Sequence, residues 1–180
     1  ESNWKPTATL KTARELGCRL GQFTIPYNGD KSVRFDALTE TKALHPSLRD
    51  WDWRDCQAVQ YQLRAVVLKL KANDRDCRIQ MRGNTNALAC GAAKYNGGAG
   101  SIAKRIRLCR AIVGCDPKEW FGNLELRCPQ SQVKVHGYGE SFCTINSKYP
   151  GRVFARMSKF EKYLTPPPPK IGTSQITGQF

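Results

Sequence analysis

The sequence predicts an α+β fold, an antiparallel β-sheet with two to three helices packed on one face and disulfides holding the layers together. Three observations lead to this expectation. Eight cysteines are spread through the 180 residues. Two segments repeat apolar residues at helical spacing, and from Gly122 onward short alternating runs are separated by turn-forming residues. Helices combined with antiparallel strands in one chain are typical of an α+β sandwich.

The N-terminal part is expected to hold a short helix and two strands. PTATLKTARELG (6–17) has a threonine that can cap a helix and a glycine that can end it. QFTIPY (22–27) and SVRFDAL (32–38) have the composition of strands, and the tripeptide NGD between them favours a turn. The next segment contains Trp51 and Trp53, which we expect to cover the end of a small core rather than to form an exposed binding ledge.

Two longer segments predict the main helices. DCQAVQYQLRAVVLKLK (55–71) can begin at Asp55, and its apolar stripe consists of Val59, Leu63, Val66, Val67 and Leu70. SIAKRIRLCRAIVG (101–114) can begin at Ser101 and end at Gly114, with an inward face of Ile102, Ile106, Cys109 and Val113. In this interpretation Cys109 joins the helix to a strand.

The remaining segments predict strands. CRIQMR (77–82) and NALACGAA (86–93) flank GNT and are interpreted as a hairpin. GNLELRC, QVKVHG, SFCTIN and RVFARM, which lie between residues 122 and 157, predict an antiparallel meander. Residues 1–164 are expected to form one compact domain, with two small subdomains dividing near residues 117–122 as the alternative. Residues 165–180 begin with four prolines and predict a flexible tail.

The cysteines predict four disulfides in an oxidising compartment. They are Cys18, Cys56, Cys77, Cys90, Cys109, Cys115, Cys128 and Cys143. An even number at dispersed positions favours disulfides over zinc, which needs closer pairs and more histidines than His45 and His136. Their pairing stays open because eight cysteines allow roughly a hundred pairings. We therefore expect a secreted, mature chain whose leader was removed, and no apolar run of about 18 residues predicts a membrane span.

The charge pattern indicates an anionic partner. The formal net charge is +14, which favours association with acidic molecules but does not identify them. The best candidate binding residues are the cations of the 101–114 helix, Lys104, Arg105, Arg107 and Arg110, because no acidic residue lies between Ser101 and Cys115. The alternative is a solvated basic surface. No aromatic residues are interleaved with these cations, so a specific nucleic-acid site is not predicted.

One pair of residues offers weak catalytic chemistry. His136 and Glu140 lie close together in a glycine-rich segment, and secreted ribonucleases use a histidine with a carboxylate for proton transfer. The alternative is a surface histidine beside a solvated glutamate. The sequence therefore predicts a protein that is not an enzyme and has no cofactor or metal.

Four segments carry a resemblance to a known group of proteins. DCQAVQYQL (55–63), ALACGAAK (87–94), GSIAKRIRLCRAIVGCDP (100–117) and GNLELRC (122–128) follow one another in the order found in fungal secreted cysteine-rich effectors. In its cysteine-bearing helices and strands, this part of the chain resembles the killer-toxin-like α/β sandwich group of these effectors.

The resemblance implies an extracellular virulence or avirulence protein that binds a host protein or receptor, or another anionic surface, without catalysis. A monomer is expected. The alternatives are a secreted ribonuclease-like hydrolase and an antimicrobial or killer toxin that acts on competing cells.

Overall fold

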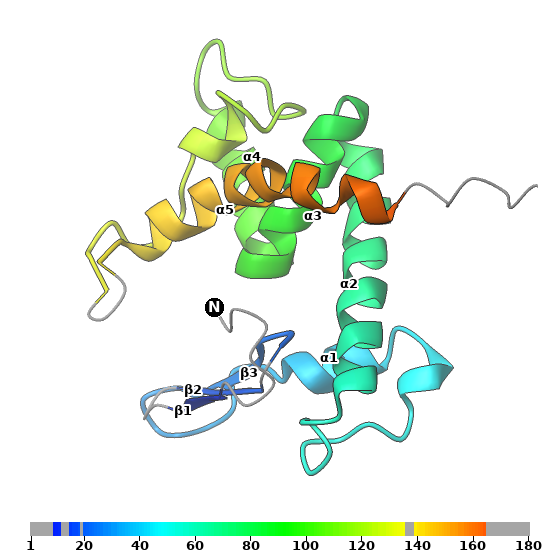
Figure 1. Ribbon diagram of the computed structural model, residues 1–180. Coiled ribbons are helices and arrows are strands. Elements are labelled where there is room, and N and C mark those ends of the chain that lie inside the picture. Colours follow the sequence, from blue (N-terminus) through cyan, green and yellow to red (C-terminus); the bar gives the residue numbers. More distant parts are fainter. Residues whose placement is uncertain (1–8, 12–14, 19, 136–138, 165–180) are drawn as a thin grey trace, which may run out of the picture.

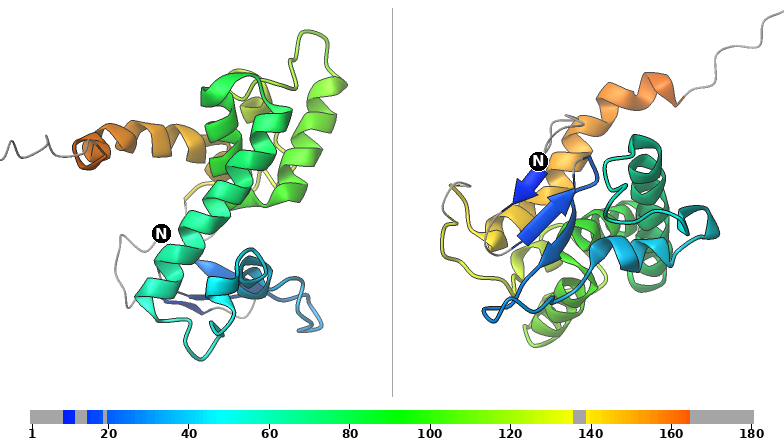
Figure 2. Two further views of the ribbon diagram at one scale, coloured as in Figure 1. Left: turned by 90° about the vertical axis from the view of Figure 1, so that its right-hand side faces the viewer. Right: turned by 90° about the horizontal axis from the view of Figure 1, so that it is seen from below.

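The computed structural model describes residues 9–11, 15–18, 20–135 and 139–164. The long helix α2 (Val59–Gln80) organises them. A small sheet and a short helix lie at one end of α2, and the other helices pack around its opposite end (Figures 1 and 2). The predicted combination of helices, an antiparallel sheet and disulfides is confirmed, but the helices and strands are distributed differently along the chain.

The sheet is formed by the N-terminal residues. Its strands β1 (Thr9–Lys11), β2 (Glu15–Cys18) and β3 (Phe23–Pro26) are antiparallel and in sequence order. The strand predicted around Phe23 is therefore confirmed, whereas the helix predicted over 6–17 is wrong where the structure describes it. As the central strand, β2 can satisfy its backbone groups on both sides, which outweighs the weak helical signals of this short segment.

The segment predicted as a second strand instead leads into a short helix. Val33 keeps one isolated bridge to Tyr27. The Asp36 carboxylate then accepts hydrogen bonds from the backbone N–H groups of Leu38 and Thr39, both at 3.0 Å, and starts α1 (Ala37–Lys42). A short 3₁₀ helix, η1 (Pro46–Leu48), follows. The N-cap makes the helical conformation favourable where composition alone favours a strand.

Apolar side chains of this part form an N-terminal cluster. Its buried members are Phe23, Ala37, Leu38, Leu48, Trp51 and Ala65. Trp51 packs edge-on to Phe23 with ring centroids 5.1 Å apart, and Trp53 donates its indole N–H to Asp36 at 2.9 Å. The expectation that these tryptophans belong to a small core is confirmed.

Two consecutive helices replace the hairpin predicted over 77–93. The helix α2 begins after Ala58, which makes no side-chain cap, rather than at Asp55. It continues through Cys77 to Gln80, and α3 (Gly83–Gly97) follows after two residues, beginning at Gly83, which has a φ of +69°. Cys77 and Met81 are four residues apart and both buried, which is helical spacing. The segment was too short for its period to be recognised from the sequence.

The next helix is α4 (Ala99–Arg110), and it ends earlier than predicted. Gly98, rather than Ser101, is its N-cap. Ile102 and Cys109 are buried as expected, and Ile106 packs against the core in part, but Val113 lies beyond the helix and is fully exposed. Cys109 pairs with Cys115 in the loop that follows. The disulfide therefore closes the end of α4 and does not connect it to a strand, which corrects our prediction.

The predicted meander after Gly122 is not formed in the described residues. A 3₁₀ helix η2 (Leu124–Leu126), an isolated bridge between Lys134 and Ser141, and the helix α5 (Phe142–Met157) with its extension η3 (Ser158–Tyr163) occupy the region. The Ser141 hydroxyl accepts a hydrogen bond from the Thr144 N–H and caps α5. The buried residues of α5 are Cys143, Asn146 and Pro150, whose spacing of three and four defines a helical face.

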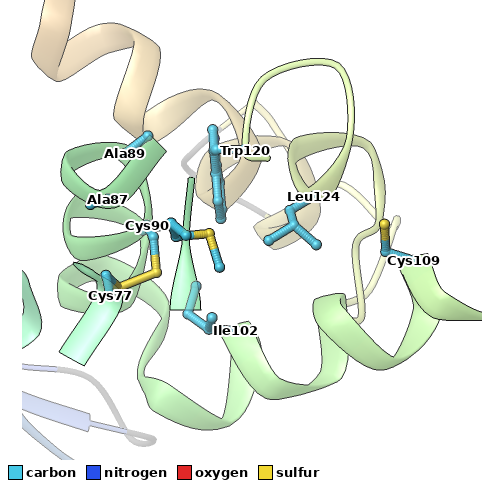
Figure 3. Close-up of a cluster of buried hydrophobic side chains, with 10 residues drawn as sticks. Cys77, Ala87, Ala89, Cys90, Ile102, Cys109, Trp120 and Leu124 are labelled. Carbon is cyan, nitrogen blue, oxygen red and sulfur yellow. A yellow bond between two sulfur atoms is a disulfide. The ribbon is translucent and has the colours of Figure 1, made fainter. Parts of the chain in front are cut away.

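A C-terminal cluster fills the space between the helices. Cys77, Ala87, Cys90, Ile102 and Trp120 are among its buried members (Figure 3). The helix α3 packs against α2, α4 and α5, whereas the short helix α1 contacts the strand β3. The longer helices therefore cover one another and do not share one face of the sheet, which corrects that part of the predicted fold class. The segment 117–122 contributes Trp120 to this cluster. Whether the chain forms one domain or two stays a prediction, and the predicted tail 165–180 lies outside the described residues.

No helix in the described part of the chain combines the length and apolarity needed to cross a membrane.

Candidate functional site

The exposed side of α4 carries a row of positive charge. Lys104, Arg107 and Arg110 are all exposed and follow one another at intervals of three residues, which places them along one side of the helix over about 9 Å. None of them is ion-paired with a described residue. We call these three residues the α4 cation row. Like charges at this spacing repel one another slightly, so the row adds little to helix stability.

Arg105, which the sequence analysis placed on the same surface, is buried. Its side chain is 1% exposed. One guanidinium nitrogen, Nη1, donates to the carbonyl oxygens of Leu124 and Glu125 at 2.9 and 3.1 Å, and Nη2 donates to the Ser147 hydroxyl at 3.1 Å. The guanidinium also lies 5.4 Å from the centre of the Trp120 ring. Arg105 therefore joins α4 to η2 and α5, and the prediction that it lies on the exposed basic surface is wrong.

Burial changes the ionisation of Arg105 without removing its charge. Desolvation lowers the pKa of the guanidinium to about 10, and the nearby charge of Glu125 opposes this shift. The group is therefore still protonated at neutral pH. The sequence held a signal for its position, since residue 105 lies three after Ile102 and four before Cys109, both on the inward face.

Of the two weak catalytic candidates, only Glu140 is described, and His136 lies outside the described residues. The Glu140 carboxylate pairs with Arg152 Nη2 at 2.6 Å and Lys148 Nζ at 3.1 Å. Hydrogen bonds from Arg152 and then Lys148 lower the pKa of this carboxyl below its usual value. A carboxylate held ionised in this way is a poor general acid at neutral pH, and its two ion pairs fix the segment before α5 against the helix.

The eight cysteines form four disulfides, as predicted. The pairs are Cys18–Cys56, Cys77–Cys90, Cys109–Cys115 and Cys128–Cys143, and no cysteine is free. Within the described residues, no three side chains of histidine, cysteine, aspartate or glutamate gather as metal ligands would.

A second candidate site is a groove of about 530 Å³, which we call the α2–α5 groove. One wall is α2, through Leu63, Val66 and Leu70, and the opposite wall is α5, through Tyr149 and Val153. The turn at residues 20–22 and the α3 residues Ala92, Tyr95 and Asn96 complete it, and Arg156, Lys159 and Phe160 lie where α5 continues into η3. Its volume is within the range of small-molecule sites, about 300–1,000 Å³.

Contacts between distant segments hold the groove in shape. The Tyr95 hydroxyl donates to the carbonyl oxygen of Gly21 at 2.7 Å. The Lys69 ammonium lies 5.6 Å from the Phe23 ring centre and 5.8 Å from that of Tyr95, and burial lowers its pKa below the usual value. Asn96 donates its side-chain amide to Asn146 of α5 at 2.6 Å. The turn 20–22, α3 and α5 are therefore fixed relative to one another around the groove.

The sequence does not reveal this groove, although the apolar stripe predicted for residues 55–71 contains part of one wall. Leu63 and Leu70 belong to the stripe predicted to face the sheet, yet they remain 41% and 40% exposed. The residues that α2 buries are mainly small or polar, namely Gln62, Ala65, Asn73 and Cys77. The helix α2 carries more large apolar residues than the core needs, and this surplus is the signal in the sequence. The sequence does not indicate which other segments lie opposite these residues.

Comparison with known proteins returned no matching family model, no matching curated protein and no matching solved structure.

Proposed function

We propose that the protein is a secreted, disulfide-stabilised effector that binds an acidic surface of a host protein through the α4 cation row, without catalysis. The observation that carries the proposal is the division of α4 into two sides. Ile102, Arg105 and Cys109 are buried, whereas Lys104, Arg107 and Arg110 are exposed and lack a described acidic partner.

The architecture supports a binding role for this side of the helix. The hydrogen bonds of Arg105 and the Cys109–Cys115 disulfide fix α4 at its middle and at its end. Because the helix is fixed, its row of cations can meet a complementary acidic surface with little loss of backbone conformational entropy. The favourable interaction of cations with the helix C-terminus accounts for Arg107 and Arg110 but not for Lys104, which lies in the first half of α4.

Four disulfides support the extracellular location because such bonds persist mainly in oxidising compartments. The resemblance to fungal effectors suggests a host protein as the partner.

The test compares two variants that lose the same charge. In the first, Lys104, Arg107 and Arg110 are replaced by Gln. In the control, Lys31, Arg34 and Arg49, which are also exposed and lie in the N-terminal part, are replaced by Gln. Wild type and both variants serve as baits in extracellular fluid of host tissue, and proteins retained by wild type are quantified by mass spectrometry. Each retained protein is then titrated against all three forms at several salt concentrations.

We expect a partner that binds the control as it binds wild type but binds the α4 variant about tenfold more weakly, with a shallower salt dependence. Equal binding of both variants would contradict the role of the cation row. Hydrolysis of RNA by the purified protein that is lost in Glu140→Gln would contradict the absence of catalysis.

A further inference from the structure

The α2–α5 groove differs in chemistry from the α4 cation row. Its walls are mainly apolar, and the residues that line it include Leu63, Val66 and Leu70 of α2 and Val153 of α5. The three α2 residues span seven positions, or about 10 Å of helix axis. A hollow of this length and volume between two helices suits an extended apolar chain better than a compact polar ligand.

Positive charge is confined to one end of this groove. Arg156 lies in the last turn of α5 and Lys159 lies three residues later in η3, and both are exposed. Neither is ion-paired with a described residue, and no acidic residue occurs among the described lining residues. An anionic group placed here would therefore meet two cations and no carboxylate among the described lining residues.

Two polar side chains of α3 that line the groove already have partners. The Tyr95 hydroxyl donates to the Gly21 carbonyl, and the Asn96 amide donates to Asn146. The polar part of a ligand is thus drawn to the charged end, and its apolar part to the walls. The same contacts hold the groove in shape, which reduces the entropy cost of binding.

We propose that the α2–α5 groove binds a single-chain anionic amphiphile, with its chain along Leu63, Val66 and Leu70 and its acidic head at Arg156 and Lys159. This inference is independent of the proposed function because it uses none of the α4 cations. The recognised chemistry is one unbranched alkyl chain with a carboxylate or phosphate head, which could be offered as a free molecule or within a bilayer.

The test uses isothermal titration calorimetry of the full chain with monomeric dodecanoate, dodecyl phosphate and the neutral 1-dodecanol. We expect both anions to bind with one site per chain, and the alcohol to bind about tenfold more weakly because it lacks the charge. Equal affinity for dodecanol and dodecanoate would overturn the assignment of the head group to the two cations.

Matched variants locate the site. Leu70→Glu places a carboxylate in the groove and is expected to abolish binding of dodecanoate. Val67→Glu adds the same charge one turn away at a position that is 55% exposed and outside the groove lining, so it should bind like wild type. The double variant Arg156→Gln and Lys159→Gln should bind dodecanoate about tenfold more weakly, whereas Lys31→Gln with Arg34→Gln should not change the affinity.

Unchanged binding by Leu70→Glu would overturn the proposal. The Arg156 and Lys159 variant keeps the test decisive if Leu70→Glu fails to fold, because both of its side chains are exposed. Flotation with phosphatidylserine vesicles distinguishes the two sources of the ligand. We expect wild type and Leu70→Glu to float equally, because a chain of net charge +14 adsorbs to an anionic surface without using the groove. Weaker flotation of Leu70→Glu would show that the groove takes its ligand from the bilayer. Equal flotation without any binding of free dodecanoate would replace the groove with adsorption of the basic protein to an anionic surface.

Discussion

Arg105 is the side chain that most directly connects the C-terminal elements. It bonds to two backbone carbonyls and one hydroxyl, and its guanidinium packs near Trp120. Replacing it with Ala would leave both carbonyls without these donors and open a cavity. We expect Arg105→Ala to lower the free energy of unfolding by about 2–4 kcal/mol, as measured by urea denaturation.

Two further variants separate packing from charge at this position. Arg107→Ala removes an equal charge from the exposed side of α4 and should change stability by less than about 0.5 kcal/mol. Arg105→Lys keeps the charge but loses the planar fork of donors, so its stability should fall between wild type and Arg105→Ala. A destabilisation equal in Arg105→Ala and Arg107→Ala would show that net charge, rather than the buried contacts, controls the stability of α4.

Gly21 is a second position that determines the packing, because there is no space there for a side chain. A Cβ added there would overlap the Phe23 ring and lie 3.0 Å from a methyl group of Val66. Phe23 is almost fully buried against Trp51, so the ring has little space to move. We expect Gly21→Ala to cost about 1–3 kcal/mol in thermal or urea unfolding. Gly29→Ala is the control because no atom lies within 4 Å of its added Cβ, and equal effects of both substitutions would refute the packing argument.

At the scale of elements, Asp36 joins the start of α1 to the segment after η1. It accepts from the N–H groups of Leu38 and Thr39 and from the Trp53 indole. Partial burial raises the pKa of the carboxyl, but the hydrogen bonds from Thr39, Trp53 and Leu38 together outweigh burial and lower it. We expect Asp36→Ala to destabilise the protein by about 1–2 kcal/mol, and Asp36→Asn to cost less because Asn also caps helices.

The same shift gives a pH dependence with a defined sign. Because the pKa of Asp36 is lower in the folded than in the unfolded protein, its contribution is complete above the unfolded pKa and is lost as the pH falls below about 4. The stability difference between wild type and Asp36→Asn should therefore shrink on acidification in urea denaturation series. A constant difference from neutral pH to pH about 2 would contradict this assignment.

The elements that the sequence predicted well are those with a long or locally complete signal. The helix pattern in 59–71 extends over several turns, and the strand at Phe23 is bounded by turn-forming residues, so both were identified. In the segments 77–82 and 141–146, the apolar pattern is too short to distinguish the period of a strand, two residues, from that of a helix, 3.6 residues. Packing against α3 stabilises the helical conformation of both segments. Similarly, the pattern of α4 predicts its exposed cations Lys104, Arg107 and Arg110. The burial of Arg105 depends on carbonyl groups of Leu124 and Glu125, which lie about 20 residues further along the chain.

The groove could be predicted least, because its lining combines residues from the turn at 20–22, α2, α3, α5 and η3. The exposed leucines of α2 indicate a groove only when the segments that form its other walls are known. The sequence determines this arrangement through contacts such as Tyr95 with Gly21, which are 74 positions apart. No local pattern indicates such a pair.

At the scale of the molecule, the disulfides follow the two apolar clusters. Cys18–Cys56 lies in the N-terminal part, and the other three pairs lie in the C-terminal part. In the chain-entropy model a longer closed loop gives a larger stabilisation. The sequence separation is 38 residues for Cys18–Cys56 and 6 for Cys109–Cys115. Replacing the first pair by Ser should therefore cost about 1.5 kcal/mol more than replacing the second.

Urea denaturation of the two double variants measures this difference, and mass spectrometry after alkylation without reductant verifies that the remaining six cysteines stay paired. A larger loss for the Cys109–Cys115 variant would mean that local order at the end of α4 outweighs loop entropy.

No disulfide joins the N-terminal cluster to the C-terminal cluster, and the element that contributes residues to both clusters is α2. Ala65 belongs to the N-terminal cluster and Cys77 to the C-terminal one. Because the helix between them is uninterrupted, unfolding of either cluster should destabilise the other. The contacts of Tyr95 with Gly21 and of Lys69 with Phe23 and Tyr95 lie beside this middle section. We therefore expect the two clusters of the wild-type protein to unfold together.

Lys71→Pro tests this coupling, because Lys71 is exposed in the middle of α2 and a proline there breaks the helix at a cost of about 3 kcal/mol. Hydrogen exchange followed by mass spectrometry reports the opening free energy of each element separately. In wild type and in the control Lys71→Ala, the slowest amides of β2–β3 and of α3 should share one opening free energy. In Lys71→Pro the two values should separate, with the three-disulfide C-terminal part remaining the more protected. Separate values already in the wild-type protein would mean that the clusters are independent and that α2 connects them without coupling them.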